Sequence, residues 1–149
     1  MLIAIIKNTA RLLLPGLIAF GISIQPLQAE ESYINESQQI LDVIDRWAEA
    51  WINLDAETYI SYYSKHYRPD NNTSHRAWVG GRKERFSQQK WVKLGISGIA
   101  IAKQDGGLYT ATFKQRYKSD SFRDSVRKEL VFKREQAQWK IIAEKIIAH

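Results

Sequence analysis

The sequence predicts an α+β domain in which three helices precede a four-stranded, mainly antiparallel sheet. Apolar residues recur at helical spacing as far as about residue 89, and from residue 91 they alternate with polar residues in four runs separated by turn signals. Helices followed by strands are typical of domains in which a sheet packs against a helical layer. The chain has 149 residues and no cysteine. We therefore expect one ordinary domain, stabilised by packing rather than by disulfides.

The first 29 residues predict a secretory signal peptide. Their only charged side chains are Lys7 and Arg11, and residues 12–24 form an uninterrupted run of apolar or small residues. This pattern indicates export, with cleavage after Ala29. A retained membrane anchor is the alternative, although a spanning helix needs about 20 apolar residues.

Cleavage would leave residues 30–149 as a periplasmic or secreted domain that contacts the membrane only where the signal segment is kept. Removing two cations and no acid leaves 20 Lys and Arg against 16 Asp and Glu, a formal charge of +4. The cations are spread along the chain without a basic run, so we expect no nucleic-acid partner. The lack of cysteine also excludes thiol nucleophiles and cysteine metal sites.

The first predicted helix covers residues 36–54, where apolar side chains recur every three or four positions. Asn35 together with Gln38 is expected to cap its start. The apolar positions are Ile40, Ile44, Trp47, Trp51 and Leu54.

Two shorter helices are expected to follow. Asp55 is placed to cap a helix that carries Tyr59 and Tyr63 one turn apart. Ser74 is placed to cap a third helix that runs to about Gln89, with two glycines near its middle.

Four strands are predicted at residues 91–102, 108–118, 126–134 and 139–147, with turns at residues 106–107 and 135–137. Strict alternation in the second strand gives it one apolar face, which must pack on the helices. In the third strand Lys128 shares a face with Leu130. For the fourth strand two inner faces are equally credible, one with Trp139, Ile141 and Ala143 and one with Ile142, Glu144 and Ile146. The apolar face of the second strand consists of Tyr109, Ala111, Phe113, Gln115 and Tyr117.

Several short motifs, in this order and spacing, resemble the nuclear transport factor 2-like (NTF2-like, or SnoaL-like) superfamily over residues 37–145. The most similar branch is the small domain at the C-terminal end of bacterial L,D-transpeptidase-related envelope proteins. The motifs are WAEAW at 47–51, AW at 77–78 with Arg82, FKQRYKSD at 113–120, KEL at 128–130 and WKII at 139–142 with Glu144.

The resemblance implies a conical fold with a strongly curved sheet, a pocket at its open end, and frequent homodimers formed through the sheet. Superfamily members include isomerases, dehydratases and cyclases as well as proteins that only bind, so the fold by itself does not give the function. No cysteine is present to act as a transpeptidase nucleophile, and cross-linking activity is therefore not expected.

The candidate pocket combines three polar side chains with a ring of aromatic ones. Lys128 and Glu144 could act as an acid–base pair, or they could form a purely structural pair while Gln115 satisfies backbone groups. No catalytic residue, metal or cofactor is assigned. The candidate pocket residues are Tyr59, Tyr63, Trp78, Gln115, Tyr117, Lys128 and Glu144.

Arg82 and Arg85 belong to the densest basic patch of the sequence and form a candidate partner surface. We expect an exported, non-catalytic binding or accessory module of the cell envelope, whose pocket or sheet surface binds an envelope protein, a peptide or a glycan linked to peptidoglycan. The alternative is a small isomerase, dehydratase or hydrolase that uses the Lys128/Glu144 pair.

Overall fold

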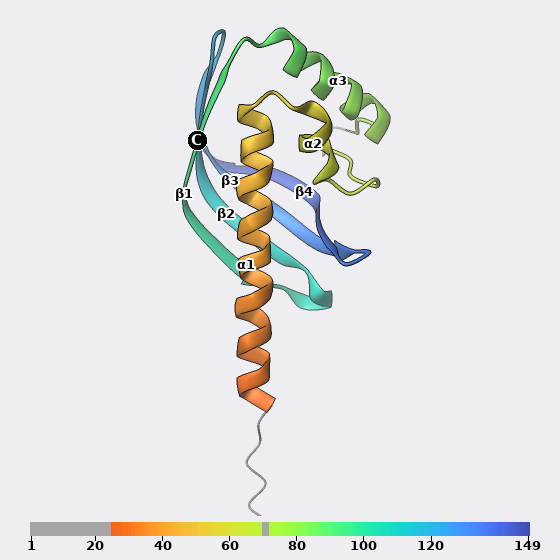
Figure 1. Ribbon diagram of the computed structural model, residues 1–149, viewed down its shortest axis with the longest axis vertical. Helices are drawn as coiled ribbons and strands as arrows, with labels where there is room; N and C mark the ends of the chain where they lie inside the picture. The colour runs from red at the N-terminus through yellow and green to blue at the C-terminus, as the bar shows by residue number, and fades with distance from the viewer. Residues whose placement is uncertain (1–24, 70–71) are drawn as a thin grey trace, which may run out of the picture.

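The computed structural model describes residues 25–69 and 72–149, and the order of its elements is the predicted one (Figure 1). The predicted leader lies largely outside the described residues, so cleavage after Ala29 stays a prediction. In the described part of the chain, no helix has the length and apolar character needed to cross a membrane. The helices are α1 (Gln25–Ile52), α2 (Ala56–Ser61) and α3 (His75–Gln88); the strands are β1 (Val92–Lys103), β2 (Tyr109–Ser119), β3 (Arg123–Glu135) and β4 (Gln138–Ala148).

Helix α1 already includes residues 25–35, which lie before the predicted start at residue 36. The expected cap at Asn35 and Gln38 is wrong because both residues lie inside the helix, where Asn35 Oδ1 accepts a hydrogen bond from Gln39 Nε2 at 2.7 Å. The physical reason is that no proline or glycine interrupts the sequence from residue 27 to residue 52.

The other two helix starts are confirmed. The Asp55 carboxylate accepts from the backbone N–H of Thr58 at 3.0 Å, and the Ser74 hydroxyl accepts from that of Ala77 at 3.2 Å. Tyr63 lies just after α2 and forms an isolated bridge with Ile141 of β4, which ties the helical layer to the sheet.

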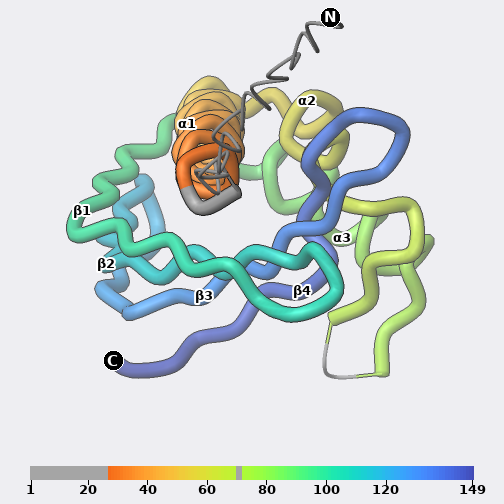
Figure 2. The backbone as a smooth tube through the Cα atoms, turned by 90° about the horizontal axis from the view of Figure 1, so that it is seen from below, coloured from red at the N-terminus to blue at the C-terminus, as the bar shows by residue number. Residues whose placement is uncertain are grey.

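The four strands form one antiparallel sheet in the order β1-β2-β3-β4. The sheet curves around α1, which lies against its inner face, while α2 and α3 close one end (Figures 1 and 2). Gln136 and Ala137 both have positive φ, as a two-residue hairpin turn between β3 and β4 requires. The predicted fold class is therefore confirmed.

A bulge in β4 resolves which of its residues face inward. Phe132 pairs with Ile141 but Val131 pairs with Ala143, so Ile142 is an extra residue. Both candidate faces are used in turn: Ile141 points inward before the bulge, and Glu144 points inward after it.

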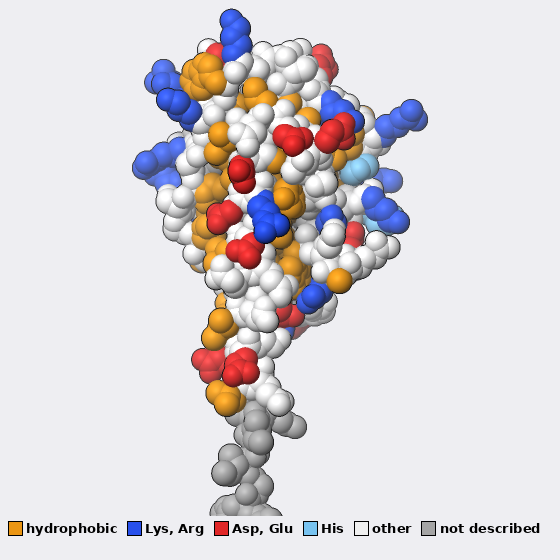
Figure 3. Space-filling view, in the orientation of Figure 1, with side chains coloured by type: hydrophobic (Ala, Val, Ile, Leu, Met, Phe, Trp, Pro, Cys, Tyr) orange, Lys and Arg blue, Asp and Glu red, His pale blue; other side chains and the backbone are white. Residues whose placement is uncertain are grey.

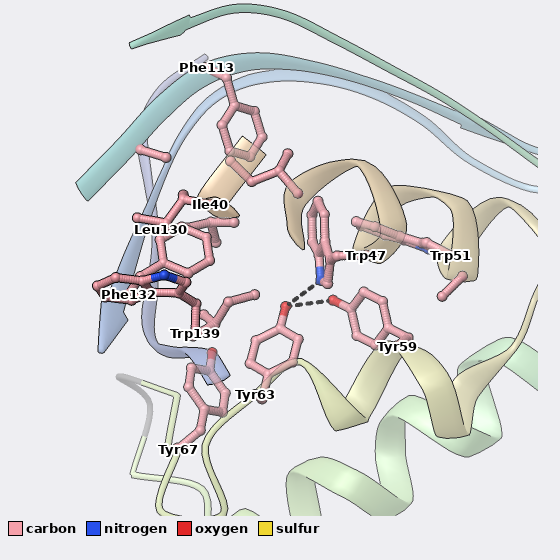
Figure 4. Packing of buried hydrophobic residues seen from close by; sticks show 14 of the residues in the cluster. Ile40, Trp47, Trp51, Tyr59, Tyr63, Tyr67, Phe113, Leu130, Phe132 and Trp139 are labelled. Carbon is pink, nitrogen blue, oxygen red and sulfur yellow. Dashed lines mark hydrogen bonds between the residues drawn. The ribbon is translucent and has the colours of Figure 1, made fainter. Parts of the chain in front are cut away.

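The core lies between α1, α2 and the inner face of the sheet (Figure 4). Trp47 is fully buried at its centre, with its ring centroid 5.6 Å from that of Tyr59 and 6.4 Å from that of Phe113. Gln115 and Lys128 are buried on the same inner face, as the alternation in β2 and β3 predicts.

Candidate functional site

An open cavity of about 480 Å³ lies between α3 and the inner face of the sheet, at the end where β2 turns into β3. Its lining combines charged, amide and apolar groups, as that of ligand sites commonly does. Its lining residues are Trp51, Arg82, Arg85, Gln89, Gln115, Tyr117, Ser121, Phe122, Asp124, Val126, Lys128, Glu144 and Ile146.

A buried ion pair forms the inner wall of the cavity. Lys128 Nζ donates to Glu144 Oε1 at 2.5 Å, and the two side chains are only 6% and 10% exposed. The ammonium group also lies 5.6 Å and 5.4 Å from the ring centroids of Trp47 and Trp51. The positive charge is therefore held by one carboxylate and two aromatic faces.

Hydrogen bonds continue from this pair into the core. Tyr63 OH donates to Glu144 Oε2 at 2.6 Å and is itself 2.8 Å from Tyr59 OH. Trp47 Nε1 donates to the same Tyr63 oxygen at 3.2 Å (Figure 4). Burial, reinforced by the charge of Glu144, raises the pKa of Tyr63 well above its usual value of 10, so this hydroxyl stays a donor.

Glu144 is ionised at neutral pH in spite of its burial. Burial alone would raise the pKa of its carboxyl, but the charges of Lys128 and Arg82 and the hydrogen bonds from Lys128 and Tyr63 outweigh this effect, and the net pKa lies below the usual 4.5. Both carboxylate oxygens already have partners inside the protein.

Two amide oxygens near the pair have no such partners. Gln115 is 5% exposed, and its Oε1 makes no hydrogen bond within the described part of the chain; the same holds for Oε1 of Gln89, whose Nε2 donates to Tyr117 OH. The idea that Gln115 serves to satisfy backbone groups is therefore not supported for its oxygen. A buried acceptor without a donor costs about 1–3 kcal/mol.

Arg82 adds a cation on the α3 side of the cavity. Its guanidinium lies 5.8 Å from the ring centroids of Tyr59 and Trp78, and among the described residues it forms no ion pair with a carboxylate. A guanidinium presents five N–H donors in a planar fork that suits carboxylate and phosphate groups.

The structure separates the seven predicted pocket residues into two groups. Gln115, Tyr117, Lys128 and Glu144 line the cavity. Three others lie elsewhere, for reasons of packing: Tyr59 and Tyr63 are buried behind the ion pair, and Trp78 borders a second, shallower hollow of about 250 Å³.

The predicted partner surface is part of the same cavity, because Arg82 and Arg85 both line it. Sequence reasoning missed Gln89, Phe122 and Asp124. The strand register offered a signal for Asp124, which pairs directly with Tyr117 and so shares its face. Phe122 lies in the turn between β2 and β3, where the alternation of a strand does not predict which way a side chain points.

A strongly curved antiparallel sheet, packed on three helices and open at one end over a mixed polar and aromatic cavity, defines a protein of the NTF2-like class. Residues 39–145 match the family model of the Cds6 C-terminal NTF2-like domain. The chain belongs to this family.

Solved structures agree on the fold. Bd1075 from Bdellovibrio bacteriovorus is 23% identical, with a TM-score of 0.67 over 75% of this chain and 40% of its own. The K307A mutant of Pgp2, a helical cell shape determining protein from Campylobacter jejuni, is also 23% identical, with a TM-score of 0.67 over 71% of this chain and 39% of its own.

A putative dehydratase of the NTF2-like family from Streptomyces avermitilis is 13% identical, with a TM-score of 0.65 over 75% of this chain and 94% of its own. No curated protein sequence matches this chain. At these identities the likeness describes the fold, and the chain spans about two fifths of the length of Bd1075 and Pgp2.

Proposed function

We propose that this chain is an exported, non-catalytic binding module of the cell envelope, and that its cavity holds a peptide or glycan group of peptidoglycan. The observation that carries the proposal is the unpartnered, buried oxygen of Gln115, a residue that lines a cavity whose ion pair is already complete. A ligand N–H or O–H that reaches this oxygen would recover the free energy lost by burying it.

The charges of the cavity support the same class of ligand. Arg82 and Arg85 are free to bind an acidic group, and Gln115 and Gln89 offer acceptors to amide or hydroxyl donors. A compound with a carboxylate beside amides or hydroxyls satisfies both sets, and peptide and amino-sugar units have this composition. The chain belongs to the Cds6 C-terminal NTF2-like family, and its structural neighbours include a cell shape determining protein; both observations support a ligand from the cell envelope.

The chemistry of the ion pair disfavours the enzymatic alternative. A general base works best with a pKa near the operating pH, whereas the pKa of Glu144 is lowered and both of its oxygens are bound. Glu144 is therefore not poised to act as a general base. The pair instead gives the cavity a fixed polar wall.

The test is a titration of isotopically labelled protein with soluble disaccharide-peptide fragments of peptidoglycan, followed by NMR. We expect shifts in the side-chain amide signals of Gln115 and Gln89, and about tenfold weaker binding for Gln115→Leu. Gln88→Leu is the matched control, because Gln88 is exposed on α3 and does not line the cavity. Fragments that leave these signals unmoved, or that are converted to product by the wild type and not by Glu144→Gln, would overturn the proposal.

A further inference from the structure

The outer face of the sheet carries an excess of positive charge that the packing of the fold does not require. Residues that pair directly across antiparallel strands lie on the same face, and the register places Lys93, Lys118 and Arg123 side by side across β1, β2 and β3. Lys114 and Arg127 form a second such pair. Like charges that lie directly opposite each other destabilise a sheet. A contribution to the stability of the fold therefore does not explain these cations.

The positive field extends over all four strands. Arg116 lies between the two rows on β2, Lys133 continues the field along β3, and Lys145 continues it along β4. Two carboxylates lie in or beside this field: Glu129 is half-buried and directly opposite Lys145, and Asp120 is exposed in the turn next to Lys118 and Arg123. The carboxylate of Glu135, at the β3–β4 turn, accepts a hydrogen bond from Ser64. None of these eight cations forms an ion pair within the described part of the chain.

On the inner side of the sheet, helix α1 is acidic, whereas α3 carries four basic residues and one acidic residue. The sequence of α1 contains six acidic residues and one basic residue, and acidic side chains are prominent along that helix (Figure 3). In the described part of the chain no helix covers the outer face of the sheet, because α1, α2 and α3 all lie on its inner side (Figures 1 and 2). The acidic helix α1 and the basic outer face thus lie on opposite sides of the sheet, which favours approach of the outer face to a negative surface.

An exposed tryptophan borders the same face. Trp91 directly precedes β1 and is two residues before Lys93, so the alternation of the strand puts both side chains on the outer face. The Trp91 side chain is 39% exposed, and its ring centroid lies 5.8 Å from Lys93 Nζ. Indole rings are amphipathic and accumulate at the headgroup level of bilayers, where Lys and Arg contact anionic lipids.

We propose that the outer face of the sheet docks on a bilayer that contains anionic lipids. The cations are spread over all four strands and do not follow a single groove. A broad negative surface therefore fits their distribution better than a linear polyanion, which would contact only one row of cations. This site lies on the other side of the sheet from the cavity and is separate from its ligand.

The test is sedimentation of the full chain with vesicles of phosphatidylglycerol mixed with phosphatidylcholine, compared with vesicles of phosphatidylcholine alone. We expect stronger binding to the anionic vesicles, which salt weakens. Replacing Lys114, Lys118 and Arg127 by Gln should weaken this binding on the order of a hundredfold, because each cation near a charged membrane contributes about fivefold.

The matched control replaces Lys65, Arg68 and Arg76 by Gln, which changes the net charge equally at exposed positions on the helical side. Equal loss in this control, or equal binding to both kinds of vesicle, would overturn the proposal. So would retention on immobilised polyphosphate without binding to vesicles, because that result would assign the face to a linear polyanion.

Discussion

Burying Lys128 and Glu144 removes two charges from water at a large cost in free energy. Each charged group has interaction partners in the core. The ammonium has a carboxylate and two indole faces, and the carboxylate has the ammonium and the hydroxyl of Tyr63. Buried ion pairs are often no more stabilising than apolar residues of similar volume. Their presence in this core therefore fits a functional wall better than a stabilising device.

Removing one partner of this pair should be far worse than removing both. Lys128→Met leaves the Glu144 carboxylate buried without its cation, and we expect it to lower the free energy of unfolding by about 3–5 kcal/mol. The double variant Lys128→Met with Glu144→Leu should recover most of this loss. Urea denaturation measures both, with Lys133→Met on the exposed outer face as the control. Equal losses in the single and double variants would contradict this explanation.

The same pair predicts a dependence of stability on pH. The pKa of Glu144 is lower in the folded state than its usual 4.5, so the unfolded chain binds a proton first as the pH falls. The stabilisation is complete above pH 4.5 and is lost as the pH falls through the lower folded value. In Glu144→Gln, the free energy of unfolding should fall less steeply over this acidic range. Parallel slopes for the two proteins in urea titrations would show that Glu144 is not responsible.

At the scale of single elements, the bulge at Ile142 places the carboxylate in the cavity. If Ile142 paired regularly instead of forming the bulge, every later side chain would change face, so Glu144 would point outward and Lys145 would point inward, toward Lys128. Deleting Ile142 removes the bulge but keeps Ala143 opposite Val131 and Glu144 opposite Leu130, so we expect the deletion variant to fold with the Lys128–Glu144 pair intact. Ile142→Val keeps the bulge and should cost about 1 kcal/mol. Thermal unfolding of both variants checks this, and a deletion variant that fails to fold would refute the assignment of Ile142 as the extra residue.

The sequence predicts the inner face of a strand only where apolar and polar residues alternate regularly along it. In β2 the alternation from Tyr109 to Tyr117 identified the inner face and placed Gln115 on it. In β4 the apolar residues Ile141 and Ile142 are adjacent, so two faces were equally credible, and only the pairing with β3 reveals the bulge. A bulge depends on the partner strand, which a single strand's pattern does not contain.

The site was predictable to a similar degree. Lys128 and Glu144 could be proposed as partners because a polar residue on an apolar face needs one. The place of Arg82 in the cavity could not, since α3 has no clear apolar stripe to say which side faces inward. Gln89 and Phe122 come from segments in which apolar residues recur at neither helical nor strand spacing. Only the three-dimensional packing brings them to the cavity.

At the scale of the whole molecule, the two proposed surfaces use opposite faces of one sheet. The inner face of β2 supplies Gln115 to the cavity, and the outer face of the same strand supplies Lys114 and Arg116 to the basic field. Adjacent residues thus serve separate partners, as the alternation of a strand allows. A cavity ligand and a charged membrane could then be bound at the same time.

The charge of the outer face also bears on the homodimer that the superfamily resemblance implies. Two copies that meet through their outer faces would bring eight cations against eight. At low ionic strength this repulsion is unscreened, and it fades when salt shortens the Debye length to about 10 Å or less. Salt should therefore strengthen dimerisation through the sheet, whereas it weakens binding to anionic vesicles.

Sedimentation velocity at low and high salt measures this effect. We expect the chain to be monomeric at low salt, and the variant with Lys114, Lys118 and Arg127 replaced by Gln to associate more readily than the wild type. The control variant at Lys65, Arg68 and Arg76 should behave as the wild type does. A dimer that is stable at low salt and weakens when the outer cations are neutralised would show that these side chains bind a second copy, and the repulsion argument would then be wrong.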